Sequence, residues 1–519
     1  MKKYFLLLLF LIALNVVHGQ TRFQKSYGGT GNEQEGAIIE TTDGGSIMVG
    51  STDGGSSGFD VYVVKSDSNG TLLWTKAYGG KGVDAGSDIS STADGGYIIT
   101  GYTDSAGVTR ALLLKISKDG ALQWTKSYGI NYEYGQSVQQ TSDKGYIVTG
   151  YTASFSSSLH MYVFKTDSVG ALQWTKKISG GGCCGDGDSG SKIMQISDGG
   201  YVVLGSTWFW GTSTGVAYLA KISPNDTLQW ENYYFNPGGA SGYSFQRTTD
   251  KGFIIMGEVY NGTYLLKTDS TGASQWSKLY VWPGVSPYNW TGISVIQAND
   301  GGYALAGNSP IHNIFLFKTA PDGSLQWAKT YGDTNHVSIS SSVLQNSDGG
   351  YLIGGYTNNF GAGSNDFYSI KTDTFGNSNC NELAVSITVT NFSFMSDGST
   401  TKDTLGAALP VTFQLDSGGV ETVFCDLIED IIKNTLQKNR IDVFPNPFSI
   451  STTLNTNENL TNATFTMYSS NGQPVKEIKN IFGKTIILQR DNLLSGLYFL
   501  RLTQGNEIFA TEKLVITDN

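Results

Sequence analysis

The sequence is poor in charge, histidine, cysteine and proline, and these scarcities exclude several classes of function. Only 15% of its 519 residues are charged and the formal net charge is −10, so electrostatic binding to nucleic acid or to an anionic membrane is not expected. The four histidines are scattered and the four cysteines include no CxxC pair, which argues against a zinc site. Beyond the N-terminus no run approaches 18 apolar residues, so no transmembrane segment is expected.

Residues 1–19 have the pattern of a secretory signal peptide. Lys2 and Lys3 precede an apolar run of about a dozen residues, and the segment ends in small residues at Val17 and Gly19. We expect cleavage after Gly19, and no cysteine follows the apolar run to carry a lipid anchor. The protein is therefore expected to be exported to a compartment that permits disulfides.

Glycine and aromatic residues are abundant, and they occur in a repeated pattern. Three markers each occur seven times: DGALQWTKSYG (119–129), DGGYIITG (94–101) and VYVVKSDSNG (61–70), with Phe23 in the tryptophan position of the first copy. Each unit of about fifty residues predicts four short strands joined by tight Asp-Gly turns. An all-β fold with four strands per unit, repeated seven times, predicts a seven-bladed β-propeller over residues 20–379.

The two ends of the repeat region complement one another. After Gly376 the tryptophan position holds Cys380 and no Trp-Lys-Tyr pattern follows, whereas Phe23 to Tyr27 supplies an extra copy of that strand at the N-terminus. We therefore expect the N-terminal strand to complete the last blade, which closes the ring and removes an open edge.

The repeated Trp-Lys-Tyr trio is interpreted as a structural device. Trp124, Lys126 and Tyr128 alternate along a strand, so they share one face of it. A catalytic or binding box would need one good copy, whereas these copies are interchangeable. The aspartate of each Asp-Gly-Gly turn is likewise interpreted as a turn former.

Candidate ligand-binding residues lie in the loops that vary between repeats. Strands that run up and down place the variable loops together on one rim, and the four tryptophans outside the repeat pattern all fall there. Aromatic side chains on a rigid scaffold can bind sugars or a protein, or they can pack under their own loops. The candidates are Trp208, Phe209, Trp210, Trp282, Tyr288 and Trp290.

The same loops contain the unusual stretch GGGCCGDGDSG. Asp186 and Asp188 could bind calcium, which is the one cofactor that the sequence suggests. The adjacent Cys183 and Cys184 are either a strained disulfide or two free thiols. No Ser-His-Asp trio or pair of catalytic acids emerges from the spacing, so no catalytic residue can be named.

The repeats stop near residue 380, and residues 380–440 have a different pattern. LAVSITVTNFSF and LPVTFQLDSGGVETVFC predict strands of a small β segment, and a disulfide between Cys380 and Cys425 would bracket it. DLIEDIIKNTLQKN (426–439) has apolar residues at helical spacing, which predicts a linker helix.

The last 79 residues, 441–519, resemble a known targeting domain. IDVFPNPFS, FTMYSSNGQPV, LLSGLYFLRL and EKLVI follow one another in the order found in the type A C-terminal sorting domain of the type IX secretion system of Bacteroidota. The resemblance implies a small β-sandwich, transit of the outer membrane, and contact with the secretion machinery and a sortase. The residues that carry it are Pro445, Asn446, Pro447, Gly472, Gly496, Leu497 and Tyr498.

The sequence thus predicts a secreted or cell-surface protein whose propeller binds or adheres to an extracellular glycan or protein. Two alternatives stay open at this stage. One is a propeller enzyme that acts on extracellular polysaccharide, and the other is a structural component of the cell surface.

Overall fold

The computed structural model describes the chain except for residues 1–20, 55–57, 106, 154–158, 179–186, 208–214, 237, 284–290, 310–312, 334–335, 360, 362, 379, 398–401, 404–407, 411–413, 417–419, 428–440, 470–473, 506 and 519. The chain divides into two compact units, Met1–Glu429 and Asp430–Asn519. The predicted signal peptide and all of the predicted linker helix except Asp426 and Leu427 lie outside the described residues. Those two residues end a β-strand.

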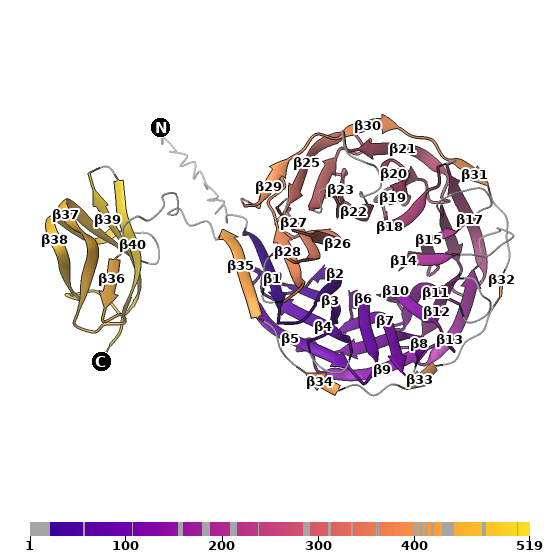
Figure 1. Cartoon of the computed structure of the whole chain (residues 1–519), viewed down its shortest axis with the longest axis horizontal. Helices are drawn as coiled ribbons and strands as arrows, with labels where there is room; N and C mark the ends of the chain where they lie inside the picture. Colours follow the sequence, from indigo (N-terminus) through magenta and orange to yellow (C-terminus); the bar gives the residue numbers. More distant parts are fainter. Residues whose placement is uncertain are drawn as a thin grey trace, which may run out of the picture. The chain divides into compact units, whose positions relative to one another are not determined.

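The first unit is a ring of seven antiparallel sheets (Figure 1). The innermost strands are β2 (Gln34–Glu40), β6 (Val83–Ser91), β10 (Glu133–Gln140), β14 (Ser189–Gln195), β18 (Ser241–Arg247), β22 (Thr291–Gln297) and β26 (Ser338–Gln345). The second strands are β3 (Ser46–Thr52), β7 (Tyr97–Ser105), β11 (Tyr146–Thr152), β15 (Tyr201–Thr207), β19 (Phe253–Val259), β23 (Tyr303–Asn308) and β27 (Tyr351–Thr357). The third strands are β4 (Asp60–Ser66), β8 (Val108–Ile116), β12 (His160–Thr166), β16 (Val216–Ile222), β20 (Gly262–Thr268), β24 (Ile314–Thr319) and β28 (Asp366–Lys371). The fourth strands, which carry the repeated tryptophan or Phe23, are β5 (Leu72–Gly79), β9 (Leu122–Tyr128), β13 (Leu172–Ile178), β17 (Leu228–Phe235), β21 (Ser274–Val281), β25 (Leu325–Tyr331) and β1 (Arg22–Gly28).

The sheets are the blades of a seven-bladed β-propeller, which confirms the predicted fold class. We number the blades from blade 1, which begins with β2, to blade 7, which begins with β26. The second and third strands have apolar residues at consecutive positions because both faces of each sheet are covered by neighbouring blades. Ile147 and Val148 illustrate this pattern, since the first packs toward blade 4 and the second toward blade 2.

The ring is closed by the N-terminal strand, as the sequence predicted. β1 pairs with β28 in antiparallel register from Phe23 opposite Lys371 to Tyr27 opposite Phe367. The first strand of the propeller is thus the fourth strand of its last blade. This pairing leaves no unpaired edge where the ring begins and ends.

The Trp-Lys-Tyr trio joins neighbouring blades, which confirms its structural interpretation. The buried Tyr128 hydroxyl donates to the Gly170 carbonyl oxygen of the next blade at 2.7 Å. Lys126 Nζ donates to the Val169 carbonyl oxygen at 2.6 Å and lies 5.8 Å from the centre of the Trp124 ring. The same tyrosine-to-glycine bond occurs at Tyr27–Gly70, Tyr78–Gly120, Tyr234–Gly272, Tyr280–Gly323 and Tyr331–Gly376.

Changing Tyr128 to phenylalanine should therefore destabilise the propeller by about 1–3 kcal/mol. The substitution keeps the ring but leaves the buried Gly170 carbonyl oxygen without its partner. Denaturant unfolding followed by tryptophan fluorescence measures the change. Tyr132→Phe is the control, because Tyr132 is half exposed. Equal losses in the two variants would contradict the role of the Tyr128 hydroxyl in joining the blades.

The turn after the innermost strand, which reads Asp-Gly-Gly in five blades and Asp-Lys-Gly in blades 3 and 5, contains an ion pair that the sequence analysis did not anticipate. In blade 2 Asp94 accepts bonds from the Gly96 amide at 3.0 Å and from Thr92, and it pairs with the buried Lys115 of β8 at 2.9 Å. Burial alone would raise the pKa of Asp94, but the bonds from Thr92, Lys115 and Gly96 lower it to about 2. The seven pairs are Asp43–Lys65, Asp94–Lys115, Asp143–Lys165, Asp198–Lys221, Asp250–Lys267, Asp300–Lys318 and Asp348–Lys371.

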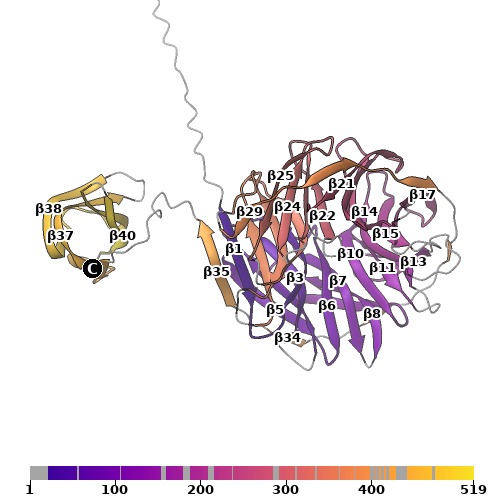
Figure 2. The same cartoon turned by 45° about the horizontal axis from the view of Figure 1, so that its top comes forward.

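The sequence predicts strands of a small β segment after residue 380, and residues 380–427 do contain strands. Their described strands form no sheet of their own, and each adds a fifth strand to the outer edge of one blade. We call this segment the belt (Figure 2). Its strands are β29 (Glu382–Ala384), β30 (Thr388–Asn391), β31 (Met395–Asp397), β32 (Lys402–Asp403), β33 (Ala408–Pro410), β34 (Gln414–Asp416) and β35 (Val420–Leu427).

The belt passes once around the propeller in the order opposite to that of the blades. β29 pairs with β25 of blade 6, the following strands pair with blades 5 to 1 in turn, and β35 pairs with β1 of blade 7. An edge strand exposes unpaired backbone groups to water and to other chains. The belt supplies hydrogen-bond partners to the outer edge of every blade.

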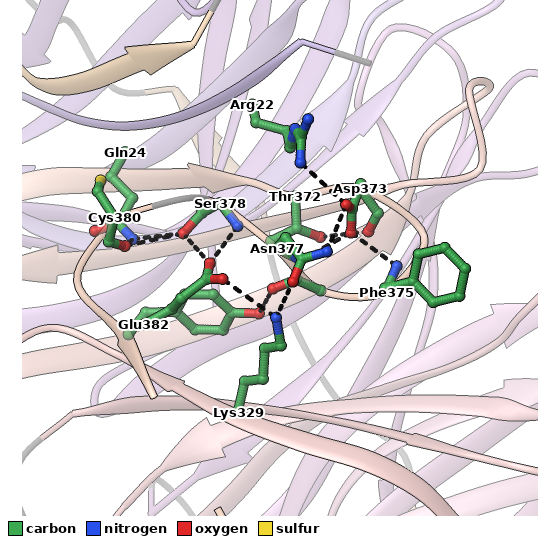
Figure 3. A network of polar contacts seen from close by, with 12 residues as sticks. Arg22, Gln24, Lys329, Thr372, Asp373, Phe375, Asn377, Ser378, Cys380 and Glu382 are labelled. Carbon is green, nitrogen blue, oxygen red and sulfur yellow. Dashed lines mark hydrogen bonds and ion pairs between the residues drawn. The ribbon is translucent and has the colours of Figure 1, made fainter. Parts of the chain in front are cut away.

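The belt begins close to where it ends. The Gln24 amide of β1 donates to the Ser378 hydroxyl at 2.7 Å and to the Cys380 carbonyl oxygen, and Lys329 pairs with Glu382 at 3.2 Å (Figure 3). Cys380 is disulfide-bonded. Cys425 lies opposite Gln24 in the pairing of β35 with β1. This placement agrees with the expected Cys380–Cys425 disulfide, although the Cys425 side chain lies outside the described part of the structure.

The second unit is a five-stranded antiparallel fold. Its strands are β36 (Ile441–Phe444), β37 (Ser451–Ser469), β38 (Pro474–Gln489), β39 (Gly496–Gln504) and β40 (Glu507–Ile516). β37 pairs with β36 through its first half and with β39 through its second half, and register shifts separate the two halves. The two halves enclose one core that includes Leu454, Phe465, Met467, Leu500 and Leu514.

The Pro-Asn-Pro motif, Pro445 to Pro447, joins β36 to β37. The Asn446 side chain donates to the Lys513 carbonyl oxygen at 2.7 Å and accepts from the Val515 amide at 2.8 Å. Its amide thus bonds to the edge of β40 as a strand residue would, which ties the motif to the last strand. Of the other residues of the predicted signal, Gly496, Leu497 and Tyr498 begin β39, and Gly472 lies outside the described residues.

Candidate ligand-binding site

Most of the predicted loop aromatics lie outside the described residues. These are Trp208, Phe209, Trp210, Tyr288 and Trp290. Trp282 is described: it is partly buried and packs against the core between blades 5 and 6. Its role in ligand binding stays a prediction.

Asp188 is a buried carboxylate in a repeated setting. It accepts a hydrogen bond from Thr207, and its Oδ2 lies 3.9 Å from Nδ1 of His160. Burial, aided by Lys177, lowers the pKa of that histidine. The same acid-to-threonine bond begins three earlier blades at Glu33–Thr52, Asp84–Thr103 and Glu133–Thr152.

This repetition gives Asp188 a structural role at a blade interface. Its predicted calcium-binding companion, Asp186, lies outside the described residues, as do Cys183 and Cys184. Within the described part of the chain no three histidine, cysteine, aspartate or glutamate side chains gather in a way that could hold a metal ion.

A cavity of about 860 Å³ lies at the centre of the propeller, lined by the innermost strands of all seven blades. Figure 1 shows these innermost strands arranged around the centre of the ring. Serine and glutamine dominate its polar wall. Among them are Ser87, Ser90, Ser91, Gln136, Gln139, Ser189, Ser191, Ser244, Gln246, Ser294, Ser341, Ser342 and Gln345. The cavity is suited to a ligand rich in hydrogen-bonding groups.

The charged groups of the cavity wall are already engaged. Lys192 Nζ pairs with Asp88 at 3.1 Å, and the Ser137 hydroxyl donates to the same Asp88 oxygen at 2.8 Å. Glu40 accepts a bond from the Ser347 amide and is attracted by Lys371. These contacts join residues of different blades, so they hold the wall together as well as neutralising it.

Glutamines at the ends of the innermost strands also link the blades. The side-chain Oε1 of Gln140 accepts a hydrogen bond from the backbone amide of Ala93 in the preceding blade at 2.7 Å. The side-chain Nε2 of Gln140 donates to the backbone carbonyl oxygen of Lys144 at 3.2 Å. Equivalent bonds occur at Gln195, Gln297 and Gln345. A glutamine three residues before the turn aspartate is the sequence signal for this contact.

Four tyrosines form a cluster where blades 2 and 3 meet, and we call it the tyrosine row. Tyr134 of β10 stacks on Tyr151 of β11, with ring centres 4.6 Å apart and planes 18° apart. On its other side it meets Tyr102 of β7 at 4.7 Å, and Tyr132 approaches it edge-on at 5.9 Å. Tyr151 also lines the central cavity. The row therefore reaches from the cavity to the rim that carries the variable loops.

The hydroxyls distinguish this row from the framework tyrosines. The hydroxyl of Tyr128 and those of its repeats each donate to a glycine carbonyl oxygen. In the described residues, no hydrogen bond involves the hydroxyl of Tyr102, Tyr132, Tyr134 or Tyr151. Burial raises the pKa of Tyr102 and Tyr151 above the usual value, so both hydroxyls keep their protons near neutral pH. The row thus offers unpaired donors and acceptors beside apolar rings.

Sequence reasoning missed this row because it searched the loops. Tyr102 and Tyr151 occupy the Gly-Tyr-Thr position of adjacent blades. Tyr132 directly precedes β10, the strand between them, and Tyr134 lies in it. The signal was NYEYG (131–135), where two aromatic residues flank Glu133 at the start of the innermost strand. Only the packing of adjacent blades brings the four side chains together.

Comparison with known families identifies the second unit. Residues 442–517 match the family model described as a secretion system C-terminal sorting domain. The molecule therefore combines a β-propeller with a type IX secretion sorting domain. It is a cargo of that machinery, directed to the outer cell surface or beyond it. Among the described residues, no helix has the length and apolar character needed to cross a membrane.

Comparison with solved structures returns distant β-rich proteins. Sqt1 from Chaetomium thermophilum is 11% identical with a TM-score of 0.39, and the match covers 70% of this chain and 88% of that one. The extracellular domain of a putative hybrid two component system, BT3049, from B. thetaiotaomicron is 10% identical with a TM-score of 0.28, covering 93% and 72%. No curated protein gave a significant match.

Proposed function

We propose that the propeller is an extracellular binding and adhesion module, which the sorting domain delivers to or beyond the outer cell surface. A sortase would remove that domain after export. The ligand, a glycan or a protein, would bind at the mouth of the central cavity, on the rim with the variable loops. The observation that carries the proposal is the tyrosine row, whose hydroxyls are unpaired and whose member Tyr151 lines the cavity.

An enzyme acting on polysaccharide is supported by one observation only, the cluster of Asp88, Ser137 and Lys192 in the cavity wall. The Ser137 hydroxyl donates a hydrogen bond to Asp88, and Asp88 is also paired with Lys192. The three groups satisfy one another across blades 2, 3 and 4. This arrangement supports the wall of a binding cavity better than an activated nucleophile or a pair of catalytic acids.

The proposal predicts that the exported protein binds an extracellular ligand at the cavity. Labelled full-length protein is applied to arrays of glycans and of extracellular proteins, beside the variant Ser294→Arg. That change places a long cationic side chain in the cavity wall, and it should reduce binding at least ten-fold. Ser168→Arg, the same change on an exposed turn of the opposite rim, is the control and should leave binding unchanged.

Two results would argue against this function. Failure to bind any glycan or protein on either array would remove the binding role altogether. Binding that Ser294→Arg leaves intact would place the ligand away from the central cavity.

A further inference from the structure

The tyrosine row has the chemistry of a carbohydrate-binding surface. We propose that Tyr102, Tyr132, Tyr134 and Tyr151 bind a neutral, hydroxyl-rich glycan at the cavity mouth. This inference rests on the proposed binding function and narrows its ligand to one chemical class. Three features of the row and its surroundings carry it: the ring surfaces with their hydroxyls, the backbone of Tyr132, and the charge of the cavity.

The rings and hydroxyls together match a sugar better than a purely apolar or purely polar ligand. Tyrosine rings bury a large apolar area at little cost in conformational entropy, and the C–H face of a hexose ring can stack on them. The four unpaired hydroxyls can then exchange hydrogen bonds with sugar hydroxyls. Where the row meets the cavity, the serine and glutamine wall continues the same chemistry.

Tyr132 is held in a backbone conformation that is costly for a bulky residue. Its φ of 72° lies in the left-handed region, which a bulky residue rarely adopts, yet its ring is 50% exposed. Two backbone bonds fix it there: its amide donates to the Thr109 carbonyl oxygen at 2.7 Å, and its carbonyl oxygen accepts from the Ala153 amide at 3.1 Å. The structure thus holds an exposed ring in a set position, which lowers the entropic cost of binding a ligand.

The charges near the site favour a neutral glycan over an acidic or cationic ligand. In the cavity Lys192 is neutralised by Asp88, and Glu40 is held by Ser347 and Lys371. Near the row, the Asp104 carboxylate accepts bonds from the Gly107 amide and the Thr109 hydroxyl of its own hairpin. An anionic ligand would find no unpaired cation in the described cavity wall, whereas sugar hydroxyls can bond to serine, glutamine and tyrosine alike.

The test uses the full-length exported protein and an array of neutral hexose oligosaccharides beside sulfated and uronic-acid glycans. The best neutral oligosaccharide is then titrated by calorimetry against two variants. The triple change Tyr102→Phe, Tyr134→Phe and Tyr151→Phe keeps the stacked rings and removes only hydroxyls that bond to nothing in the described structure. Tyr132→Asn removes the exposed ring, and asparagine tolerates the left-handed backbone.

Each variant should lose affinity at least ten-fold while its melting temperature stays unchanged, because each hydrogen bond to a ligand contributes roughly two- to ten-fold. Phe375→Ala is the matched control, since its ring is 68% exposed on a turn of the opposite rim. Its affinity should equal that of the wild type. Binding should also be insensitive to salt, as expected for an uncharged ligand.

The inference fails if no neutral glycan binds, if only acidic glycans bind with strong salt dependence, or if neutral glycans bind both variants as tightly as the wild type. Binding to an extracellular protein alone would overturn the glycan assignment and leave the proposed function standing. A protein that binds nothing on the glycan array or on the array of extracellular proteins would overturn both this inference and the proposed function.

Discussion

Replacing Cys380 by serine is expected to release the belt from the outer edges of the blades while the propeller stays folded. Cys380 is disulfide-bonded and its expected partner is Cys425, near the other end of the belt. A disulfide that closes a loop of roughly 45 residues stabilises the closed form by about 4 kcal/mol in the chain-entropy description. Most of that stability should be lost, because the belt strands between the two ends are two to four residues long.

Hydrogen exchange of belt peptides and trypsin cleavage after Lys402 measure the release. Exchange in the belt should accelerate by two to three orders of magnitude, whereas exchange in β7 and β11 should stay slow. Cys425→Ser and the double variant supply the control. If the two cysteines pair, both single changes and the double change should have the same effect. Additive effects, or a belt that exchanges as slowly as in the wild type, would contradict the closed belt.

The belt also shows what the sequence could not reveal. Seven blades and their closure by β1 were predicted correctly because three separate markers repeat seven times and each carries its own turn chemistry. The belt has no such period: β29 to β34 are too short to show alternation, and their partners lie up to several hundred residues away. Glu382 pairs with Tyr331 nearby in sequence, but Gln414 pairs with Gly79. A segment whose strands form only by pairing with the outer strands of the blades has little sequence pattern of its own.

The candidate site was predictable only in part, for a similar reason. Subtracting the framework tryptophans from the chain directed attention to aromatic residues on the loop rim. It could not find the tyrosine row, because Tyr102 and Tyr134 come from different blades and meet only when those blades pack. The calcium-binding role of Asp188 stays a prediction, because its companion Asp186 lies outside the described residues. The neighbours of Asp188 in sequence suggested a metal turn, whereas its bond to Thr207 repeats a contact found in earlier blades.

Changing Asp84 to asparagine is expected to stabilise the propeller by about 3 kcal/mol at pH 7. Asp84 is 1% exposed, and its Oδ1 has no hydrogen-bond partner among the described residues. Burial, together with the nearby Asp60 and Asp104 carboxylates, raises the pKa of Asp84 to about 6. Each unit of difference between the pKa values in the folded and unfolded states changes the free energy of unfolding by about 1.4 kcal/mol. Asparagine can keep the bond from the Gly80 amide, which is 2.9 Å long, and its NH₂ can donate toward Asp60.

The direction in which stability changes with pH follows from the raised pKa of Asp84 in the folded state. Because the pKa of Asp84 is raised in the folded state, its contribution is fully present below about pH 4 and is lost as the pH rises through about 6. Wild-type stability should therefore increase as the pH falls from 7 to about 4. Below that it should decrease, because the pKa values of Asp94 and Asp250 are lowered to about 2 and their ion pairs are lost as the pH falls toward that value.

Urea unfolding at several pH values between 7 and 3 separates the two effects. Asp84→Asn should remove the rise between pH 7 and 4 and retain the fall at lower pH. Asp119→Asn removes a charge from an exposed turn and should reproduce the wild-type curve. A variant that follows the wild-type curve at every pH would show that Asp84 is not strained by burial beside Asp60. A variant less stable than the wild type at pH 7 would show that the ionised carboxylate is needed where blades 1 and 2 meet.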